Sequence, residues 1–218
     1  MAVDLRLYAL LDPAQSGGRT LGELAALIAR SATIVQLRDK HRTTRAMIAE
    51  AREIMAALDG RAPLLINDRV DVALAAEADG VHIGWDDIEP ADARLLLGRR
   101  AIIGLSLKSV EQAQAAPLDL LDYVAIGGVY VTQSKDNPAP PVGLDGLAAI
   151  LKTVRARAPR MPVCAIAGIN ASNAADVIAA GADGVAVISA LSLAGDPAKA
   201  ARDLRVLIDD ALARRGRP

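Results

Sequence analysis

The chain has 218 residues, of which 25 are Lys or Arg and 26 are Asp or Glu, so its net charge is −1. This balance argues against nucleic acids and anionic membranes as partners, because both bind basic surfaces. A single cysteine excludes an internal disulfide, and no apolar stretch approaches the roughly 18 residues of a membrane span, so we expect a cytoplasmic protein.

Eight short runs rich in Leu, Ile and Val alternate with Ala-rich stretches along the chain. The runs lie at residues 7–11, 33–38, 63–67, 80–84, 101–106, 123–128, 162–168 and 184–189. Runs that are apolar throughout are typical of parallel strands buried on both faces, and the stretches between them have the apolar spacing of amphipathic helices. Eight strands that each precede a helix predict an α/β fold, a (β/α)₈ TIM barrel in one domain over residues 1–218. The segments 75–84 and 179–189 partly repeat each other, as expected when one βα unit recurs around a barrel.

The end of the second run carries a row of polar residues. Active sites of this fold lie at the C-terminal ends of the strands, so polar side chains there are candidates. The segment VQLRDK places Gln36, Arg38 and Lys40 on one face, because side chains alternate along a strand. Such a row favours an anion at the barrel mouth, and the alternative is a solvated strand end with surface ion pairs.

The third and fourth runs end in INDR and HIGWDD, which contain Asn67, Asp68 and Asp87. Two carboxylates at neighbouring strand ends, Asp68 and Asp87, would attract a divalent cation. Mg²⁺ typically takes one or two carboxylates, with water and substrate phosphates as its other ligands. The alternative is that Asp68 caps the following helix. The residues alone leave both interpretations open.

The later strand ends carry small, hydroxylated and basic residues. They are Ser106, then Thr132, Ser134 and Lys135 in one long loop, and Gly168 and Ser189 after the last two runs. Phosphate commonly binds to the last two βα loops of this fold, so a phosphorylated ligand is expected, although each Gly or Ser alone also suits a simple turn. His82 and Cys164 lie within runs and are interpreted as buried core residues.

Taken together, the strand ends resemble the thiamine phosphate synthase family over essentially the whole chain. The motifs are VQLRDK, LLINDRVDVALAAEADGVHIG, IIGLS, TQSK, PPVGLDGL, AIAGI and VAVISA. Asp68, Asp87 and Ser106 also follow one another at the spacing of the family. The chain departs from the family at Trp85, where Gln is usual, at Gly128, where Pro is usual, and at Ser134, where Thr is common.

The resemblance implies a transferase that condenses hydroxymethylpyrimidine diphosphate with thiazole phosphate, giving thiamine phosphate and diphosphate. It implies a dissociative substitution assisted by Mg²⁺, with Asp68 and Asp87 as the metal ligands. The implied substrate-binding residues are Gln36, Arg38, Lys40 and Asn67 for the pyrimidine diphosphate, Ser106 and Lys135 on the diphosphate side, and Thr132, Ser134, Gly168, Ile188 and Ser189 for the thiazole phosphate. Of these, Arg38, Lys40, Ser106 and Lys135 are expected to be catalytic.

Three other functions remain open from the sequence. A thiazole tautomerase-like paralogue would not need both the QLRxK row and the Asp pair, and a phosphate-sugar isomerase needs an acid and base that the motifs do not supply. A non-catalytic phosphate-ligand-binding barrel would bind product tightly without turnover. The expected partners are small phosphorylated molecules, and the sequence is compatible with a homo-oligomer.

Overall fold

Eight parallel strands close into a barrel in the computed structural model, which describes residues 3–132 and 140–216. Each strand pairs with the next along the chain, and β8 pairs with β1. The strands are β1 (Leu7–Leu11), β2 (Ile34–Leu37), β3 (Leu64–Asn67), β4 (Gly80–Ile83), β5 (Ile102–Leu107), β6 (Tyr123–Ile126), β7 (Val163–Ile166) and β8 (Gly184–Val187). The (β/α)₈ fold predicted from the sequence is confirmed. Six strands are one to three residues shorter than their runs at one or both ends, and β5 is shifted by one residue toward the C-terminus.

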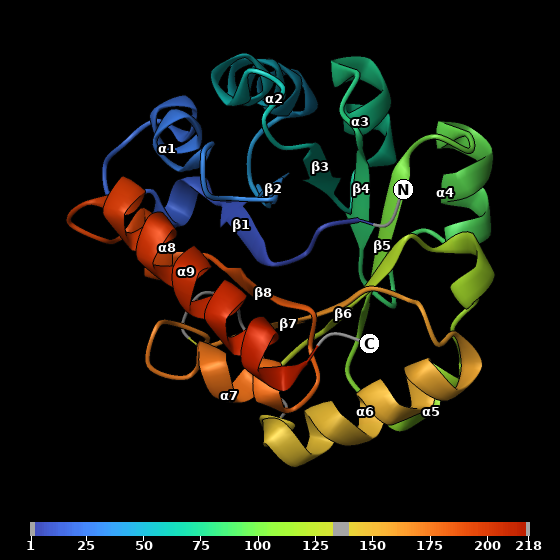
Figure 1. Cartoon of the computed structure of the whole chain (residues 1–218). Coiled ribbons are helices and arrows are strands. Elements are labelled where there is room, and N and C mark those ends of the chain that lie inside the picture. Colours follow the sequence, from blue (N-terminus) through green and yellow to red (C-terminus); the bar gives the residue numbers. More distant parts are fainter. Residues whose placement is uncertain (1–2, 133–139, 217–218) are drawn as a thin grey trace.

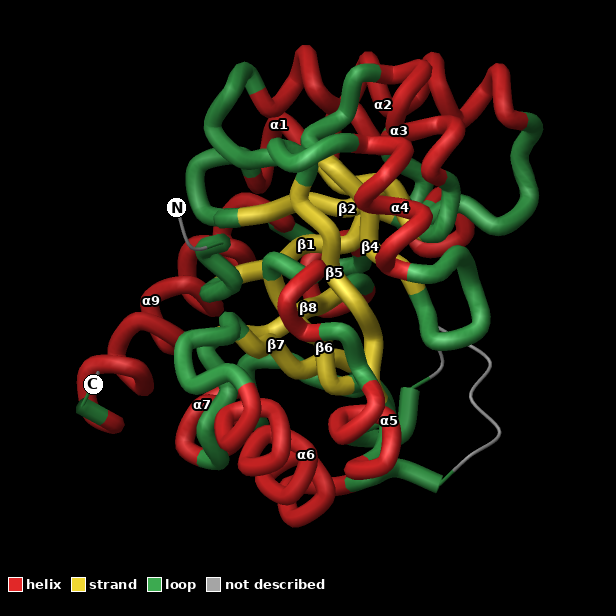
Figure 2. The backbone as a smooth tube through the Cα atoms, turned by 90° about the vertical axis from the view of Figure 1, so that its right-hand side faces the viewer, coloured by secondary structure: helices red, strands yellow, loops and turns green. Residues whose placement is uncertain are grey.

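Helices surround the barrel, as Figure 1 shows. They are α1 (Leu21–Ile28), α2 (Thr44–Leu58), α3 (Val70–Ala76), α4 (Pro90–Leu97), α5 (Val110–Ala115), α6 (Gly143–Arg157), α7 (Ala174–Ala179), α8 (Ser189–Ser192) and α9 (Pro197–Arg215). Two short 3₁₀ helices are also described: η1 (Pro13–Gln15) lies between β1 and α1, and η2 (Leu118–Leu120) lies between α5 and β6. The long α9 packs against α1 and α7 and so closes the ring of helices (Figure 2). Within the described ranges, no helix is both long enough and apolar enough to cross a bilayer.

The strands separate two apolar cores, because alternate side chains point into the barrel or toward the helices. The larger core lies between the strands and the helices. The smaller core fills the barrel and comprises Leu5, Tyr8, Leu10, Ile34, Leu65, Tyr123, Ala125, Cys164 and Ala186. Cys164 is completely buried there, so it is the small core residue that the sequence indicates.

A repeated hydrogen bond fastens the N-terminal ends of the strands. The residue directly before each even-numbered strand accepts a bond from a backbone N–H at the start of the preceding strand. We call these four residues, Thr33, Asp79, Asp122 and Asp183, the strand clamps; their bonds are 3.1, 2.8, 2.9 and 2.9 Å long. Asp79 and Asp183 occupy the same position in the two repeated segments of the sequence. The repeat is therefore explained by the structure of the barrel base.

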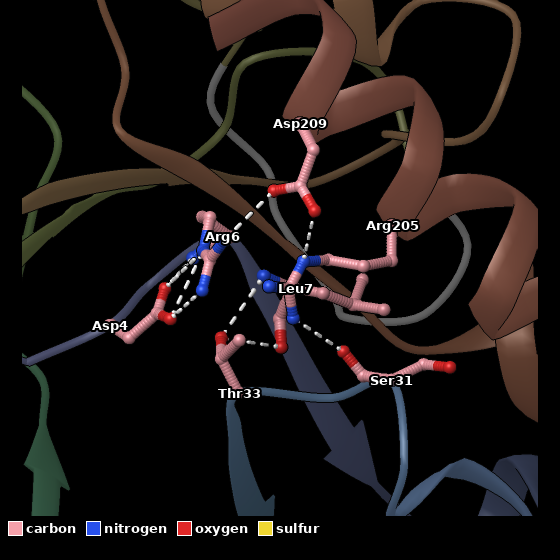
Figure 3. A network of polar contacts seen from close by, with 7 residues as sticks. All are labelled: Asp4, Arg6, Leu7, Ser31, Thr33, Arg205 and Asp209. Atoms are coloured by element: carbon pink, nitrogen blue, oxygen red, sulfur yellow. Dashed lines mark hydrogen bonds and ion pairs between the residues drawn. The ribbon is translucent and has the colours of Figure 1, made fainter. Parts of the chain in front are cut away.

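Polar contacts also join the segments around Thr33, the first strand clamp, to the C-terminal helix α9 (Figure 3). Arg205 of α9 donates to the backbone carbonyl of Ser31 at 3.1 Å and to the carboxylate of Asp209 at 2.9 Å. Arg6, next to β1, donates to the same Asp209 at 3.1 Å. These bonds hold α9 against the N-terminal end of the barrel, away from the βα loops that carry the candidate site.

Candidate active site

A cavity of about 590 Å³ opens at the C-terminal ends of the strands. This volume lies within the usual range for small-molecule sites. The lining includes eight of the residues selected from the sequence, which are Gln36, Arg38, Asn67, Ser106, Thr132, Gly168, Ile188 and Ser189. The structure therefore brings together strand ends that are far apart in the chain.

The other five residues selected from the sequence are not among the described residues that line the cavity. Ser134 and Lys135 lie outside the described residues. Lys40, Asp68 and Asp87 are not among the described residues that line the cavity. They are nevertheless joined to it, because the side-chain amide of Asn67 donates to the Asp68 carboxylate at 2.7 Å.

Asp68 and Asp87 form a carboxylate pair at the ends of β3 and β4. Asp68 directly follows β3 with a φ of +61°, and its backbone N–H donates to the carbonyl of His82 at 2.8 Å. The Asp87 carboxylate accepts a 2.7 Å bond from the backbone N–H of Gly84 and lies close enough to Asp68 for the two carboxylates to interact. Partial burial and the adjacent Asp68 together raise the pKa of Asp87. A divalent cation would relieve the repulsion within this pair.

The interpretation of Asp68 as a helix cap is wrong. Helix α3 begins at Val70, its N-cap residue is Arg69, and no side chain provides a capping hydrogen bond. The Asp68 carboxylate instead accepts hydrogen bonds from Lys40 and Asn67. The side chain thus belongs to the polar contacts of the barrel mouth rather than to the helix.

Two cations at the mouth are each held by a carboxylate. Arg38 pairs with Asp12, which follows β1, and Lys40 pairs with Asp68. Strand β2 ends at Leu37, but the backbone N–H of Arg38 still donates to the carbonyl of Leu11 at 2.9 Å, and Arg38 lines the cavity together with Gln36. The ion pairs fix both cations, and both remain partly exposed, so both can also contact an anionic ligand.

A continuous series of hydrogen bonds crosses the barrel interior. Gln36 Nε2 donates to the hydroxyl of Tyr8, which shares a 2.8 Å bond with the hydroxyl of Tyr123. The Tyr123 hydroxyl is 2.8 Å from His82 Nδ1, and His82 Nε2 is 2.8 Å from Ser106 Oγ. We call these five side chains the interior chain. Burial raises the pKa of both tyrosines, so both hydroxyls stay protonated.

The sequence did not identify Tyr8, Tyr123 or His82 as parts of the site. His82 is buried and bonded through both ring nitrogens, as expected for a satisfied core residue, but it also lines the cavity together with Tyr8. Lys108, which follows β5, is a further lining residue that was missed. The alternation of side chains along the strands was a signal that could have identified Tyr8 and His82. Both, like Ser106, occupy positions that point into the barrel, where an aliphatic residue would otherwise be expected.

Gly168 lies at a crowded point between the loops after β6 and β7. Its φ is +67°, and a Cβ atom there would be 2.4 Å from the backbone oxygen of Val131 and 2.7 Å from the Cβ of Tyr130. Glycine is therefore required both by the left-handed backbone and by the close approach. Ile188 and Ser189, at the start of α8, line the same cavity.

The departures from the family pattern differ in their relation to the cavity. Trp85 is 40% exposed and is not among the described residues that line the cavity. Gly128 does line it, with a φ of +73° that proline cannot adopt, so the backbone here differs from that of a chain with Pro. Ser134 lies outside the described residues.

Comparison with known proteins gives consistent results. The family model described as thiamine monophosphate synthase matches residues 7–191. The chain is 51% identical to the thiamine-phosphate synthase of Agrobacterium fabrum over 98% of each chain, and 48% identical to that of Chloroflexus aurantiacus over 94% of each. A solved structure, the thiamine phosphate pyrophosphorylase from Pyrococcus furiosus, aligns with a TM-score of 0.83 and 34% identity over 96% of this chain and 98% of that one. The 3-hexulose-6-phosphate synthase structure, at 17% identity and a TM-score of 0.66 over 93% of this chain and 99% of that one, shares the fold.

Proposed function

Because the chain belongs to the thiamine monophosphate synthase family, and so is a transferase that makes thiamine phosphate, we propose which residues carry out the reaction. Hydroxymethylpyrimidine diphosphate and thiazole phosphate would be condensed in the cavity at the C-terminal ends of the strands. One observation carries this assignment. The carboxylate pair, the two held cations and the crowded Gly168 loop all lie at the mouth of the same barrel.

Gln36 and Asn67 are assigned to the pyrimidine. Both line the cavity, and the Oε1 atom of Gln36 is buried without a hydrogen-bond partner. An unpaired buried acceptor costs about 1–3 kcal/mol, which a donor on the ligand would recover. The amino group of the pyrimidine is such a donor.

Arg38, Lys40, Ser106 and Lys135 are assigned to the diphosphate. The departing diphosphate develops negative charge, and cations held in place before the reaction lower the barrier to its departure. Asp12 holds Arg38 and Asp68 holds Lys40, so these two cations need little reorganisation. Ser106 adds a hydroxyl from inside the cavity, whereas the assignment of Lys135 rests on the sequence resemblance alone.

Asp68 and Asp87 fit a Mg²⁺ ion. They are two neighbouring carboxylates, and the pKa of one of them, Asp87, is raised. Mg²⁺ bound together with a diphosphate needs only a few protein ligands of this kind. When bound, Mg²⁺ would supply positive charge to the diphosphate oxygens. Lys40 also contacts Asp68, so a cation of the chain lies beside the same carboxylate.

Thr132, Ser134, Gly168, Ile188 and Ser189 are assigned to the thiazole phosphate. Gly168 allows the backbone to approach a ligand closely, and the loops after the last two strands are the usual phosphate site of this fold. The attacking thiazole nitrogen carries no proton, so the reaction needs no general base. This agrees with a site whose His82 is already bonded through both ring nitrogens.

The conditions in which the protein acts are inferred from the sequence. The near-zero net charge argues against nucleic acids and anionic membranes as partners, and the single cysteine fits a cytoplasmic location. Small phosphorylated molecules as partners follow from the family and from the polar residues at the strand ends. A homo-oligomer remains compatible with both.

The test is a coupling assay with the full chain, both substrates and Mg²⁺, in which thiamine phosphate is detected by mass or by fluorescence after oxidation. Product should disappear with EDTA and with Asp68→Ala. The control is Asp86→Ala, which removes an exposed carboxylate beside Asp87 and should still form product. Product that persists with EDTA would contradict the metal assignment. Substrate binding without product would contradict the assigned catalytic residues.

A further inference from the structure

We propose that the interior chain makes the cavity selective for a pyrimidine that carries an amino group rather than an oxo group, by coupling the hydrogen-bond directions at Gln36 and Ser106. Tyr8, Tyr123 and His82 would then be positioning residues, since they act through the two ends. This inference rests on the proposed function, with the pyrimidine beside Gln36 and the diphosphate beside Ser106.

The number of protons in the interior chain limits how its hydrogen bonds can be arranged. Five side chains are joined by four hydrogen bonds, and each bond uses one proton. The two tyrosine hydroxyls and a neutral imidazole bring one proton each. Three bonds are thus supplied from within, and the fourth proton comes from one end only, either the Gln36 amide or the Ser106 hydroxyl.

Only two arrangements therefore satisfy all four bonds. In the first, which the structure has at Gln36, the amide nitrogen donates to Tyr8 and Oε1 remains for a ligand. The protons then run toward Ser106, which accepts from His82 and keeps its own proton for a ligand. In the second arrangement every bond is reversed. Ser106 donates to His82, and Gln36 accepts from Tyr8 and offers its NH₂ group.

The substrate matches the first arrangement at both ends. Its amino group donates and so needs Gln36 Oε1, whereas diphosphate oxygens only accept and so need the Ser106 proton. An oxo group on the pyrimidine would require the Gln36 NH₂ group, and hence the second arrangement. The Ser106 proton would then be used within the interior chain. An oxo analogue therefore loses a hydrogen bond at one end or the other.

Packing holds the interior chain in place, so its members do not reorient separately. The rings of His82 and Tyr123 stack with centroids 5.6 Å apart, and Tyr8 meets Tyr123 edge-on at 5.8 Å. Tyr123 lies against Gly104, where a Cβ atom would be 2.0 Å from the ring. All three rings are buried, so water does not readily replace a missing bond.

The first experiment reads the direction of the interior chain in the intact protein. The protein has two histidines, His41 and His82, so the His41→Gln variant labelled with ¹⁵N-histidine reports on His82 alone. At about pH 8 an ordinary histidine is neutral, and nitrogen chemical shifts then distinguish its two tautomers. With hydroxymethylpyrimidine diphosphate bound, we expect the proton on Nε2 and an unprotonated Nδ1. A proton on Nδ1 would overturn the proposal.

The second experiment measures selectivity by calorimetry. The wild-type chain should bind hydroxymethylpyrimidine diphosphate at least about 100-fold more tightly than its 4-oxo analogue. Tyr123→Phe divides the interior chain into two independent halves, so this preference should fall about tenfold. Tyr130→Phe, the same change at the tyrosine outside the interior chain, should leave the preference unaltered.

The outcomes separate this inference from the proposed function. A wild-type chain that makes thiamine phosphate but has no preference, or a Tyr123→Phe variant that keeps the full preference, contradicts the interior-chain coupling alone. A wild-type chain that binds neither pyrimidine contradicts the proposed function and the inference together. The tautomer measurement needs no change within the interior chain, so it decides the question even when Tyr123→Phe does not fold.

Discussion

The Asp183 carboxylate accepts a 2.9 Å hydrogen bond from the backbone N–H of Val163, at the start of the neighbouring strand. The same carboxyl group pairs with Arg155 of α6 and, at 3.3 Å, with Arg215 of α9. One strand clamp thereby joins two strands of the barrel to two of its outer helices.

We expect Asp183→Ala to lower the free energy of unfolding by about 2 kcal/mol or more, because it leaves a backbone donor without its acceptor and removes the carboxylate from two arginines, which keep only their bonds to backbone carbonyls. Asp79→Ala is the matched control. Asp79 makes the same bond to a strand N–H but forms no ion pair among the described residues, so its loss should be about 1 kcal/mol. Urea unfolding measures both, and equal losses would show that the arginines add nothing.

The carboxylate pair gives a prediction about metal dependence. Asp87→Ala should raise the Mg²⁺ concentration for half-maximal activity at least about tenfold, because it removes one of two acidic ligands. Trp85→Gln restores the usual family residue at an exposed position next to these acids, and should change that concentration by less than about twofold. Binding of Mn²⁺ followed by electron paramagnetic resonance gives a readout independent of turnover. Similar effects of the two changes would refute the metal assignment.

The crowded loop at Gly168 gives a prediction about both stability and substrate binding. Gly168→Ala and Gly60→Ala each place a side chain at a left-handed φ, +67° and +69°, which costs about 1–2 kcal/mol. Only at Gly168 does the new Cβ meet other atoms, because nothing lies within 4 Å of it at Gly60. Gly168→Ala alone should therefore raise the KM for thiazole phosphate, by about tenfold. Steady-state kinetics and thermal unfolding on both variants separate crowding from backbone strain.

Cys164 gives a prediction about chemical reactivity. Burial in the barrel raises the pKa of its thiol, so the reactive thiolate is nearly absent at ordinary pH. We expect iodoacetamide to leave the native chain unmodified at about pH 8.5 and to add one group after unfolding in guanidinium. Mass spectrometry of the intact chain measures this. Rapid modification of the native chain would mean that the barrel interior opens.

The elements were predictable because their signals are local. Apolar runs and helical spacing are properties of short segments, and they led to eight strands and to the barrel. The predictions for the ends of the strands were less accurate. Strand β2 ends at Leu37, and the Asp68 side chain does not cap α3, the helix that it was considered to cap. Such details depend on partners such as Lys40, which no local pattern identifies.

Side-chain alternation could have placed the residues of the interior chain on inward positions, but their hydrogen bonds to one another could not be predicted from the sequence. Tyr8 and Tyr123 are 115 positions apart, and their hydroxyls meet only once the barrel has closed. Each tyrosine alone reads as an apolar core residue in a strand. Knowing the register of both strands would place them on inward positions, but which inward residues meet depends on the closure of all eight strands.

The contact between Gly104 and the ring of Tyr123 also limits how this barrel changes over evolutionary time. While position 123 holds tyrosine, any residue larger than glycine at position 104 would clash with the ring, so substitutions at position 104 are selected against. A lineage that replaces the tyrosine with a smaller residue releases position 104 at the same step. We therefore expect the two positions to vary together among relatives of this chain, as a single inherited unit.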